Sequence, residues 1–317
     1  MTQKICVTGA TGFIGNGVCN YLDNLGYEVI RISRDEKTGY SAVGNIDNKT
    51  NWKSVLIGSE CVVHLAARAH ILHEQSLDPR EAFFKVNVEG TLNLARQAVN
   101  AGVKRFVFIS SIGVNGETTT NQPFTEKSNV HPQSLYALSK LEAESGLRKI
   151  EKESGLEVVI IRPPLVYAAN APGNFQRLMK LVSLNVPLPF GRLNNQRSFV
   201  ALDNLTDFIA ACIHHPAAGG ETFLISDSQP VSTTELIRLL SEGMEKKVTL
   251  FPFPGSIIWL GARLIGKKKI YQQLYGSLVI DITKAGNLLG WLPPVAFDEA
   301  LKKAASAFHH AKEDGKS

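Results

Sequence analysis

Residues 4–15 read KICVTGATGFIG, and this stretch decides the fold of the chain. A short apolar run is followed by glycines at positions 9, 12 and 15, and a helical pattern begins directly behind them. In such a turn the first glycine permits the tight bend, the second lets backbone approach a pyrophosphate, and the third lets the helix pack closely on the strand. The positive end of the helix then faces the phosphates. The stretch predicts a dinucleotide-binding turn whose cofactor contacts come from Gly9, Thr11, Gly12, Phe13, Ile14 and Gly15.

Beyond the turn, strand-like and helix-like runs alternate. Four further β-rich runs are YEVIRIS (27–33), CVVHLAA (61–67), RFVFISS (105–111) and EVVIIRP (157–163), with a long helical stretch over 79–102. The runs are apolar almost throughout, as in a parallel sheet covered on both faces. We therefore expect an α/β fold with a Rossmann-type doubly wound parallel sheet, and a ligand at the carboxyl ends of its strands.

The rhythm changes after residue 167. Residues 168–197 are richer in Pro, Asn and Gly around one helical run, and the chain from 230 onward reads as helices and proline-marked loops. We expect a smaller, mostly helical C-terminal substrate lobe. The predicted division assigns 1–167 and about 198–228 to the nucleotide-binding domain, and about 168–197 and 229–317 to the lobe.

Composition narrows the class of protein. The 317 residues are 44% hydrophobic with a net charge of +5, which suits a small anionic ligand, and we expect no nucleic-acid partner. The four cysteines show no CxxC spacing, so we expect no metal site and a reducing, cytoplasmic location. No signal peptide is expected, because the chain enters a strand at once. The apolar stretch 251–266 is too short and interrupted to span a bilayer, and it either covers the core or rests on a membrane surface.

A second motif carries the chemistry. YALSK at 136–140 places Tyr136 and Lys140 four residues apart, on one face of a helix. A neighbouring ammonium favours the phenolate and lowers the phenol pKa, so the pair can serve as a general acid/base for an alcohol–ketone interconversion. Ser111, at the end of the preceding strand-like run, can hydrogen-bond the same substrate oxygen. A chance surface Tyr–Lys pair is the alternative.

Taken together, the GxxGxxG spacing, YxxxK and the serine strand resemble the short-chain dehydrogenase/reductase superfamily, in its extended NAD-dependent epimerase/dehydratase branch. The resemblance covers nearly the whole chain, through HLAA (64–67), VNVEGT (86–91), RPPLVY (162–167), GNF (173–175) and RSFVALDNL (197–205). It implies catalysis by Ser111, Tyr136 and Lys140 on a UDP-sugar, with Tyr136 and Lys140 also contacting the cofactor. Further implied cofactor contacts are Ser33, Arg34, Asn45, Ile46, Leu65, Ala66, Ala67, Asn87 and Pro163. Implied substrate contacts are Ser111, Tyr136, Asn174, Pro189, Arg197 and Tyr275.

The resemblance also implies roles and an assembly. Asn174 and Arg197 are expected at the substrate diphosphate, since the planar guanidinium meets phosphate oxygens bidentately. A helix cap is the alternative for Asn174, and a surface ion pair for Arg197. A homodimer is expected through the helices that include 80–100 and 136–150.

The stretch RISRDE (31–36) bears on the cofactor. A chain that binds NAD usually has an acid about 20 residues after the glycine turn, where it holds the adenosine ribose. Ser33 and Arg34 offer a donor and a cation instead, which favours NADP(H) over NAD(H). A merely solvated Arg34 is the alternative.

The residues after Ser111 narrow the reaction. The 4,6-dehydratases of this branch carry Asp-Glu there, whereas this chain has Ile112 and Gly113, which transfer no proton. The phrases VVHLAARAH (62–70) and FVFISSIGVNGE (106–117) resemble those of bacterial enzymes of surface-polysaccharide synthesis. This resemblance implies, as the first expectation, a reductase of UDP-4-keto-6-deoxy-N-acetylhexosamine, making UDP-N-acetylquinovosamine or UDP-N-acetylfucosamine for O-antigen or another surface polysaccharide. Tyr136 would protonate O4 as hydride reaches C4. The alternatives are a UDP-glucose or UDP-N-acetylglucosamine 4-epimerase using the same residues, and a non-catalytic nucleotide sensor.

Overall fold

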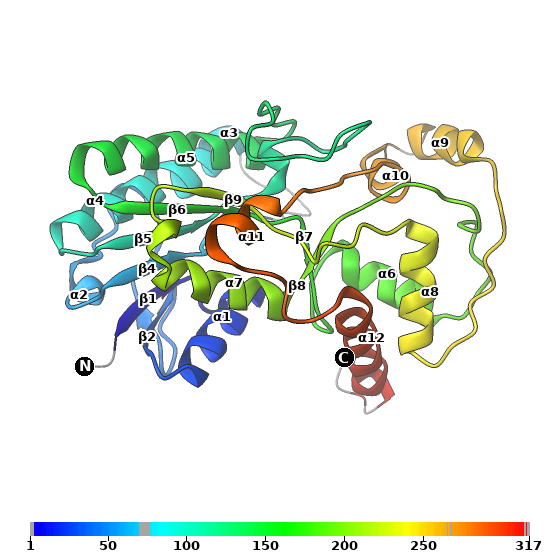
Figure 1. The fold of residues 1–317 in the computed structure, drawn as a ribbon, viewed down its shortest axis with the longest axis horizontal. Helices are drawn as coiled ribbons and strands as arrows, with labels where there is room; N and C mark the ends of the chain where they lie inside the picture. The colour runs from blue at the N-terminus through cyan, green and yellow to red at the C-terminus, as the bar shows by residue number, and fades with distance from the viewer. Residues whose placement is uncertain (1–2, 70–76, 265, 267, 314, 316–317) are drawn as a thin grey trace.

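The fold is built on a seven-stranded parallel sheet with helices on both faces, extended at one end by a group of helices (Figure 1). The computed structural model describes residues 3–69, 77–264, 266, 268–313 and 315. Its helices are α1 (Phe13–Asn24), α2 (Lys53–Leu56), α3 (Pro79–Phe84), α4 (Thr91–Asn100), α5 (Leu135–Ser154), α6 (Asn174–Ser183), α7 (Leu202–His214), α8 (Thr233–Gly243), α9 (Gly255–Leu264), α10 (Lys268–Tyr275), α11 (Thr283–Leu289) and α12 (Phe297–Glu313). Three shorter helical segments are the π-helix η1 (Lys85–Gly90) and the 3-10 helices η2 (Ile112–Val114) and η3 (Pro216–Ala218).

The seven-stranded sheet is parallel throughout. Its strands, in the order in which they lie side by side, are β3 (Ser41–Ala42), β2 (Glu28–Ser33), β1 (Lys4–Thr8), β4 (Cys61–His64), β5 (Arg105–Ile109), β6 (Glu157–Arg162) and β9 (Thr222–Leu224). The chain builds outward from β1 to β3 and then crosses back to β4, so the strand order reverses between β1 and β4. Ligands of open α/β sheets bind at such a reversal, beyond the carboxyl ends of the strands. The predicted doubly wound fold is confirmed.

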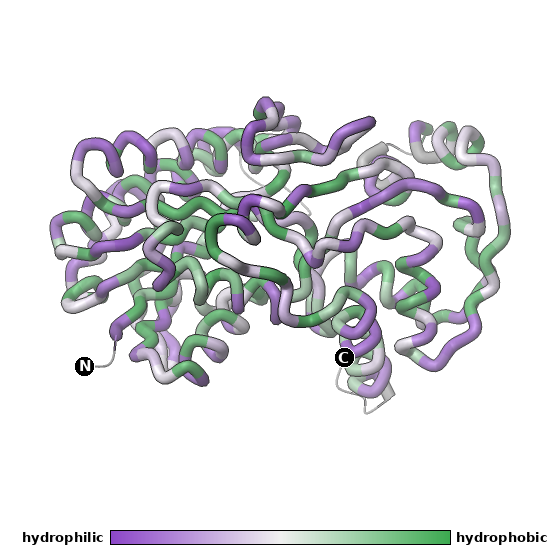
Figure 2. The backbone as a smooth tube through the Cα atoms, viewed as in Figure 1, coloured by the Kyte–Doolittle hydropathy of each residue, from purple (hydrophilic) through white to green (hydrophobic). Residues whose placement is uncertain are grey.

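The strands bury both faces, as their apolar sequences predict. In β5, Val107 belongs to the hydrophobic cluster that packs with α1 and α7. Its neighbours Phe106 and Phe108 belong to the cluster on the other face, with α4 and α5. Successive side chains of a strand point to opposite faces, so a strand covered on both sides must be apolar at every position. Figure 2 shows this as hydrophobic segments running through the sheet.

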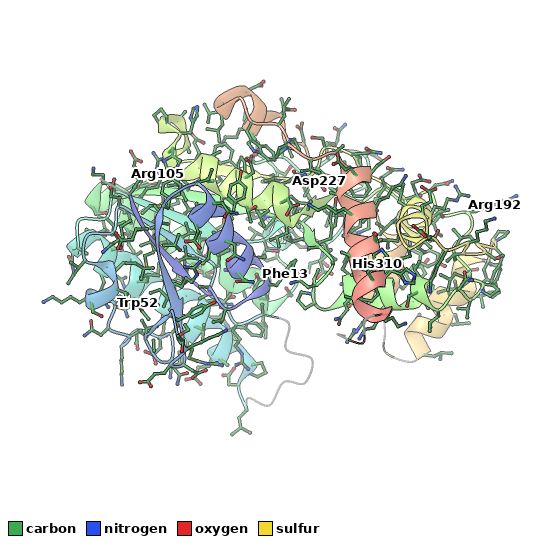
Figure 3. All side chains as sticks on the ribbon, turned by 90° about the horizontal axis from the view of Figure 1, so that it is seen from below. Phe13, Trp52, Arg105, Arg192, Asp227 and His310 are labelled. Atoms are coloured by element: carbon green, nitrogen blue, oxygen red, sulfur yellow. The ribbon has the colours of Figure 1, made fainter. Side chains whose placement is uncertain are left out.

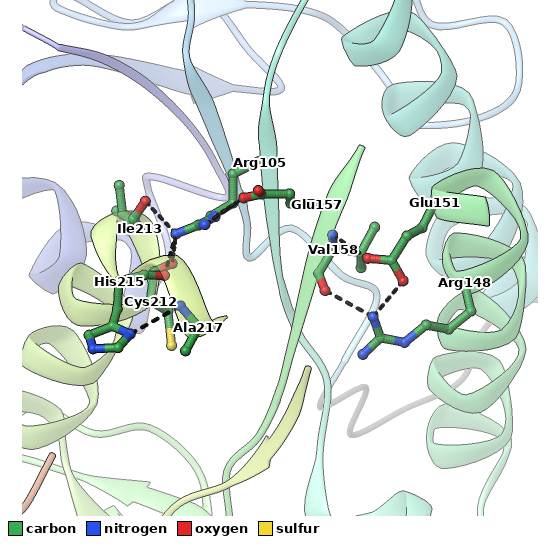
Figure 4. Close-up of polar contacts among 9 residues, drawn as sticks. All are labelled: Arg105, Arg148, Glu151, Glu157, Val158, Cys212, Ile213, His215 and Ala217. Carbon is green, nitrogen blue, oxygen red and sulfur yellow. Dashed lines mark hydrogen bonds and ion pairs between the residues drawn. The ribbon is translucent and has the colours of Figure 1, made fainter. Parts of the chain in front are cut away.

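A buried arginine ties the sheet to the end of α7 (Figure 4). The Arg105 guanidinium donates to the carbonyl oxygens of Cys212, Ile213 and His215 at 2.9–3.0 Å. It also donates to the Glu157 carboxylate on the neighbouring strand at 2.8 Å. The last carbonyls of a helix have no partner within the helix, and a cation there is favourable. This contact therefore fixes the end of α7 to the start of β5.

The helices at the other end enclose a separate core. Helices α6, α8 and α12 bury an apolar cluster that includes Phe175, Leu240 and Leu301. The cluster continues into a small parallel sheet of β7 (Leu165–Tyr167) and β8 (Phe199–Ala201).

One buried carboxylate joins the elements between the two cores. Asp227 accepts hydrogen bonds from the Tyr167 hydroxyl, the Ala201 backbone N–H and the Asn204 amide, at 2.7–3.0 Å. Burial raises the pKa of Asp227, and the three donors oppose that rise. Figure 3 shows Asp227 and Phe13 between the sheet and the C-terminal helices, with Arg192 at the far end of the molecule.

Candidate cofactor and active site

The glycine turn leaves no room for side chains. Gly9 has φ +68°, and a Cβ added there would lie 2.7 Å from the backbone nitrogen of Ala66. A Cβ on Gly15 would lie 2.0 Å from the Gly9 carbonyl oxygen. Both glycines are therefore required by the close approach of the turn to the loop after β4 and to the first turn of α1.

The N-terminus of α1 is open to an anion. Its N-cap residue, Gly12, supplies no capping side chain, and the first turn of the helix holds no acidic residue. An uncapped helix start presents backbone N–H groups and the positive end of the helix dipole. Together with the bare glycine turn, this fits the pyrophosphate of a dinucleotide. Thr11, Phe13 and Ile14 lie in the same turn, and Phe13 packs against the C-terminal core.

The loop after β4 is held by a buried histidine. His64 Nδ1 lies 2.6 Å from the Thr8 hydroxyl, and Nε2 lies 2.9 Å from the Thr91 hydroxyl. Since Thr91 gives its hydrogen to the Asn87 carbonyl, we assign the ring hydrogen to Nε2. Burial lowers the pKa of His64 to about 3, so the ring is neutral. Its role is to hold β1, β4 and α4 together beside Leu65, Ala66 and Ala67.

Ser33 and Arg34, on which the expectation of NADP rests, both contact the neighbouring residue Asp35. The Ser33 hydroxyl donates to the Asp35 carbonyl at 2.5 Å. The exposed Arg34 guanidinium lies 3.5 Å from the Asp35 carboxylate. The backbone N–H groups of Val43 and Gly44 donate to the carbonyls of Ser33 and Arg34. Asn45 and Ile46 follow directly, so this pairing brings them close to the end of β2.

Lys140 is fixed to the end of β5. Its Nζ donates to the Ile109 carbonyl at 2.7 Å and lies 4.4 Å from the centre of the Phe108 ring. Tyr136, one turn earlier, has its ring centre 6.0 Å from the same Nζ. The helix start is set by Ser134, whose hydroxyl accepts from the Ala137 N–H. The structure thus brings Tyr136 and Lys140 together with the strand that ends before Ser111.

Ser111 sits at the start of η2, directly after β5. Its hydroxyl accepts from the Gly113 N–H at 3.1 Å, and its side chain is half-buried. The following N–H, of Ile112, donates to the Pro163 carbonyl at 3.0 Å. This bond places Pro163 beside the same turn, and neither residue after Ser111 is acidic.

The pKa values of the pair reflect burial. Burial lowers the pKa of Lys140 to about 7, and the charge of Glu144 opposes that shift. Burial also raises the pKa of Tyr136 to about 12. The expectation of a lowered phenol pKa is wrong, because burial disfavours the charged phenolate.

Asn87 supports the site from the π-helix η1. Its Oδ1 accepts from the Arg68 N–H at 2.8 Å, and its Nδ2 donates to the Arg68 carbonyl and to the Ser139 hydroxyl. Ser139 in turn donates to the Tyr136 carbonyl at 2.8 Å. One amide therefore joins the loop after β4 to the turn of α5 that carries Tyr136. A π-bulge at a functional site is a recurrent arrangement.

A buried network behind Lys140 was not expected from the sequence. Glu144 pairs with Arg162, forming hydrogen bonds of 3.0 and 2.5 Å, and accepts from the Ser110 hydroxyl. Arg162 also donates to Asn115 at 3.0 Å. Asn115 is buried and accepts this bond with its Oδ1, so it supports the ion pair. The available signal was the spacing of four between Lys140 and Glu144.

Three of the predicted substrate residues, Asn174, Arg197 and Tyr275, lie around the last turn of α10. The exposed Asn174 amide donates to Gln273 at 2.6 Å. It is the first residue of α6 and does not cap the helix, because the N-cap is Gly173. Arg197 donates to the Gly276 carbonyl at 3.0 Å. Burial lowers the pKa of this half-buried guanidinium, and no ion pair is formed to it among the described residues.

Tyr275 lies in the same turn with its polar atom free. It stacks on Tyr271 with ring centres 4.4 Å apart, and its buried hydroxyl has no hydrogen-bond partner among the described residues. Pro189 stands apart, lining a cavity of about 380 Å³ with Arg192, Leu193 and residues 252–254.

The loop after Ser111 reaches this turn directly. Thr119 donates its N–H to the Ser277 carbonyl at 2.8 Å, and its hydroxyl accepts from the Val279 N–H at 3.0 Å. These two hydrogen bonds thus join the loop that follows Ser111 to the segment that follows Tyr275. No group of three or more His, Cys, Asp or Glu side chains in the described parts of the chain could hold a metal ion.

Comparison with known proteins gives a family. The profile of the NAD dependent epimerase/dehydratase family matches residues 5–226. A UDP-glucose 4-epimerase of Vibrio cholerae is 41% identical over 319 residues, covering 98% of this chain and 97% of the relative. An Escherichia coli O157:H7 relative, N-acetyl-alpha-D-glucosaminyl-diphospho-ditrans,octacis-undecaprenol 4-epimerase, is 24% identical, covering 99% and 98%.

A solved structure agrees with this match. The UDP-glucose 4-epimerase of Thermotoga maritima with UDP-glucose superposes with a TM-score of 0.75 at 25% identity, covering 98% of this chain and 99% of that one. The chain belongs to the NAD-dependent epimerase/dehydratase family of the short-chain dehydrogenase/reductase superfamily.

Proposed function

We propose that the protein interconverts the C4 epimers of a UDP-hexose, with NAD retained as its cofactor. One arrangement carries the proposal: Lys140 is pinned beside Tyr136 at the strand end that leads to Ser111, with no carboxylate following that serine. This set can move a single proton at one sugar oxygen. The 41% identity to the Vibrio cholerae UDP-glucose 4-epimerase favours epimerisation over the reductase that the sequence suggested first.

The residues that would hold NAD are those of the open turn and its neighbours. The amides at the start of α1 would bind the pyrophosphate, and Leu65–Ala67 would pass beside it. When bound, NAD supplies the acceptor and donor of hydride for C4. Lys140 would reach the ribose hydroxyls next to the reacting ring.

Tyr136 would act as the acid and base at O4. Its phenolate takes the hydroxyl proton as the ketone forms, and its phenol returns the proton afterwards. The Lys140 ammonium would favour the phenolate, against the burial that raises the pKa of Tyr136. Ser111 donates to O4 and holds the carbonyl in line. Between the two half-reactions the sugar turns over, so that the same residues serve both faces.

The cofactor proposal differs from the first expectation from the sequence. NADP(H) was favoured because Ser33 and Arg34 replace the usual acid. The Ser33 hydroxyl now serves the Asp35 carbonyl, and Arg34 is paired with the Asp35 carboxylate. With a family profile for NAD-dependent enzymes, these contacts support NAD.

The UDP moiety is proposed to lie against the last turn of α10. The Arg197 guanidinium and the Asn174 amide would meet the diphosphate, and the unpartnered Tyr275 hydroxyl would bind a further polar group. We propose no role for Pro189 beyond the wall of its cavity. The proposed domains keep the expected division near residues 167, 198 and 228, but the two cores depart from it: Phe199 and Ala201 belong to the C-terminal core, and Ala285 and Trp291 belong to the core of the sheet. A homodimer through α3, α4 and α5 is proposed from the family, and the molar mass by light scattering tests it.

A product assay tests the function. Purified protein is incubated separately with UDP-glucose and UDP-N-acetylglucosamine, with no added cofactor, and the 4-epimers are followed by chromatography. We expect interconversion in at least one pair, and its loss in Tyr136→Phe. Oxidation of NADPH by UDP-4-keto-6-deoxy-N-acetylglucosamine, without any interconversion, would restore the reductase.

A further inference from the structure

Helix α9 turns an apolar face outward. Ile257, Leu260 and Leu264 are spaced as i, i+3 and i+7 on one side of the helix and are 55%, 52% and 79% exposed. The side chain of Ile258 is more buried than theirs. At the start of the helix, Gly255 packs against the Tyr275 ring. The helix thus presents large apolar side chains to water, where an ordinary surface helix presents polar ones.

The segment around α9 carries only positive charge. No Asp or Glu occurs between Glu245 and Asp281. Six basic residues lie in that interval: Lys246, Lys247, Arg263, Lys267, Lys268 and Lys269. Their sum of +6 exceeds the net charge of +5 of the whole chain, so the rest of the protein sums to −1. The net positive charge of the chain therefore comes from this segment.

An aromatic–cation pair borders the apolar face. The Arg263 guanidinium lies 5.3 Å from the centre of the Trp259 ring, one turn away on α9. Trp259 is 40% exposed. Side chains with an apolar body and a polar tip are favoured at the boundary between hydrocarbon and water. Two further exposed aromatics, Phe251 and Phe253, precede the helix and stack edge to face.

We propose that α9 and the residues before it dock the protein on the surface of an anionic lipid bilayer. An amphipathic helix with basic flanks lies in the plane of such a surface, its apolar face buried at the level of the headgroups. Figure 1 places α9 at the outer end of the molecule, beside α10 and away from the sheet. Spanning is not involved, since no helix within the described residues is long and apolar enough to cross a membrane.

Charge distinguishes the bilayer from a second copy of the chain. In an isologous dimer through α9, each basic segment would face its own copy across a two-fold axis. Like charges held close together oppose that contact. An anionic surface instead complements them, and its attraction is weakened by salt.

Vesicle sedimentation tests the proposal. The full chain is mixed with vesicles of phosphatidylcholine, or of phosphatidylcholine with phosphatidylglycerol. The probe variant combines Ile257→Glu, Leu260→Glu and Leu264→Glu. The matched control combines Leu25→Glu, Ile57→Glu and Leu292→Glu, which are similarly exposed at 53%, 64% and 72%. Circular dichroism and turnover of the free nucleotide sugar show that both variants fold.

We expect binding to the phosphatidylglycerol vesicles, weakened by 0.5 M NaCl. The probe variant should bind about tenfold less than the wild type, and the control variant should match the wild type. Absence of wild-type binding, or equal binding by the probe variant, would overturn the proposal. So would a probe variant that only shifts the molar mass from dimer to monomer, which would assign the face to a second copy.

Discussion

The Lys140 ammonium donates to the Ile109 carbonyl at 2.7 Å, across 31 positions of sequence. The contact joins the helix that carries Tyr136 to the strand that leads to Ser111. Burial takes the amine out of water and lowers its pKa to about 7. The contact with Ile109 fixes the position of the amine, whereas its weak hold on a proton comes from the burial.

Replacing this lysine should stop turnover without unfolding the protein. Lys140→Met removes the charge that favours the Tyr136 phenolate, and we expect kcat to fall about 10²–10⁴-fold. Since the folded pKa lies below the ordinary value of 10.5, wild-type stability rises with pH from about 7 to 10.5, and the variant should lack this rise. Lys149→Met, on the exposed face of the same helix, is the control. Equal kcat in the two variants would contradict the role of Lys140.

Acid should destabilise the protein through His64. The folded pKa of about 3 lies below the ordinary 6.5, so the unfolded chain binds more protons between these values and stability falls with falling pH. From pH 7 to 5 the loss is about 2 kcal/mol. Urea unfolding at pH 7 and pH 5 measures it. His64→Gln should lose less than the wild type over this interval; an equal loss would show that another group dominates.

Breaking the buried ion pair should change both stability and titration. Glu144→Gln leaves the Arg162 charge uncompensated in the interior, at a cost of about 3 kcal/mol in the free energy of unfolding. Because Glu144 holds the pKa of Lys140 up, the variant should shift the pH profile of kcat to lower pH. Glu142→Gln, exposed on the same helix, should do neither. An unshifted pH profile of kcat in a folded Glu144→Gln variant would show that the pair of Glu144 and Arg162 does not affect the titration of Lys140.

The glycine turn can be tested at one atom. In Gly15→Ala the new methyl meets the Gly9 carbonyl oxygen at 2.0 Å, so the turn must shift and the open start of α1 with it. We expect the purified variant to carry less than about a tenth of the wild-type NAD, measured in an acid extract, because the pyrophosphate site depends on that geometry. Gly261→Ala, with free space around its Cβ, is the control. Full NAD content in Gly15→Ala would place the cofactor elsewhere.

Glycine spacing and apolar periodicity predicted those elements of the fold that depend on residues close together in the sequence. The apolar run, the turn and the helix of residues 4–24 follow from glycine spacing and periodicity, and the two-faced sheet follows from strands that are apolar throughout. The i, i+4 spacing predicted that Tyr136 and Lys140 share a face. The stretch 79–102 was expected to be one helix, and the structure divides it into α3, η1 and α4. A π-helix leaves no periodic signature in a single sequence.

Long-range contacts and the balance of charge could not be predicted in this way. The bond from Lys140 to Ile109 and the pairing of Glu144 with Arg162 depend on the packing of α5 against β5 and β6. The direction of the Tyr136 shift depends on burial, which a motif does not state. Ser33 and Arg34 looked free in sequence, yet both engage Asp35.

The fate of the hydrogen at C4 tests the central claim most directly. An epimerase returns the hydrogen that it removes, so protein given UDP-glucose deuterated at C4, without added cofactor, should yield UDP-galactose with deuterium at C4. The same result is expected for the N-acetylated pair if that is the substrate. Mass spectrometry and proton NMR of the product measure the label. Product that has exchanged this deuterium for solvent hydrogen, or no product from either pair, would contradict the account.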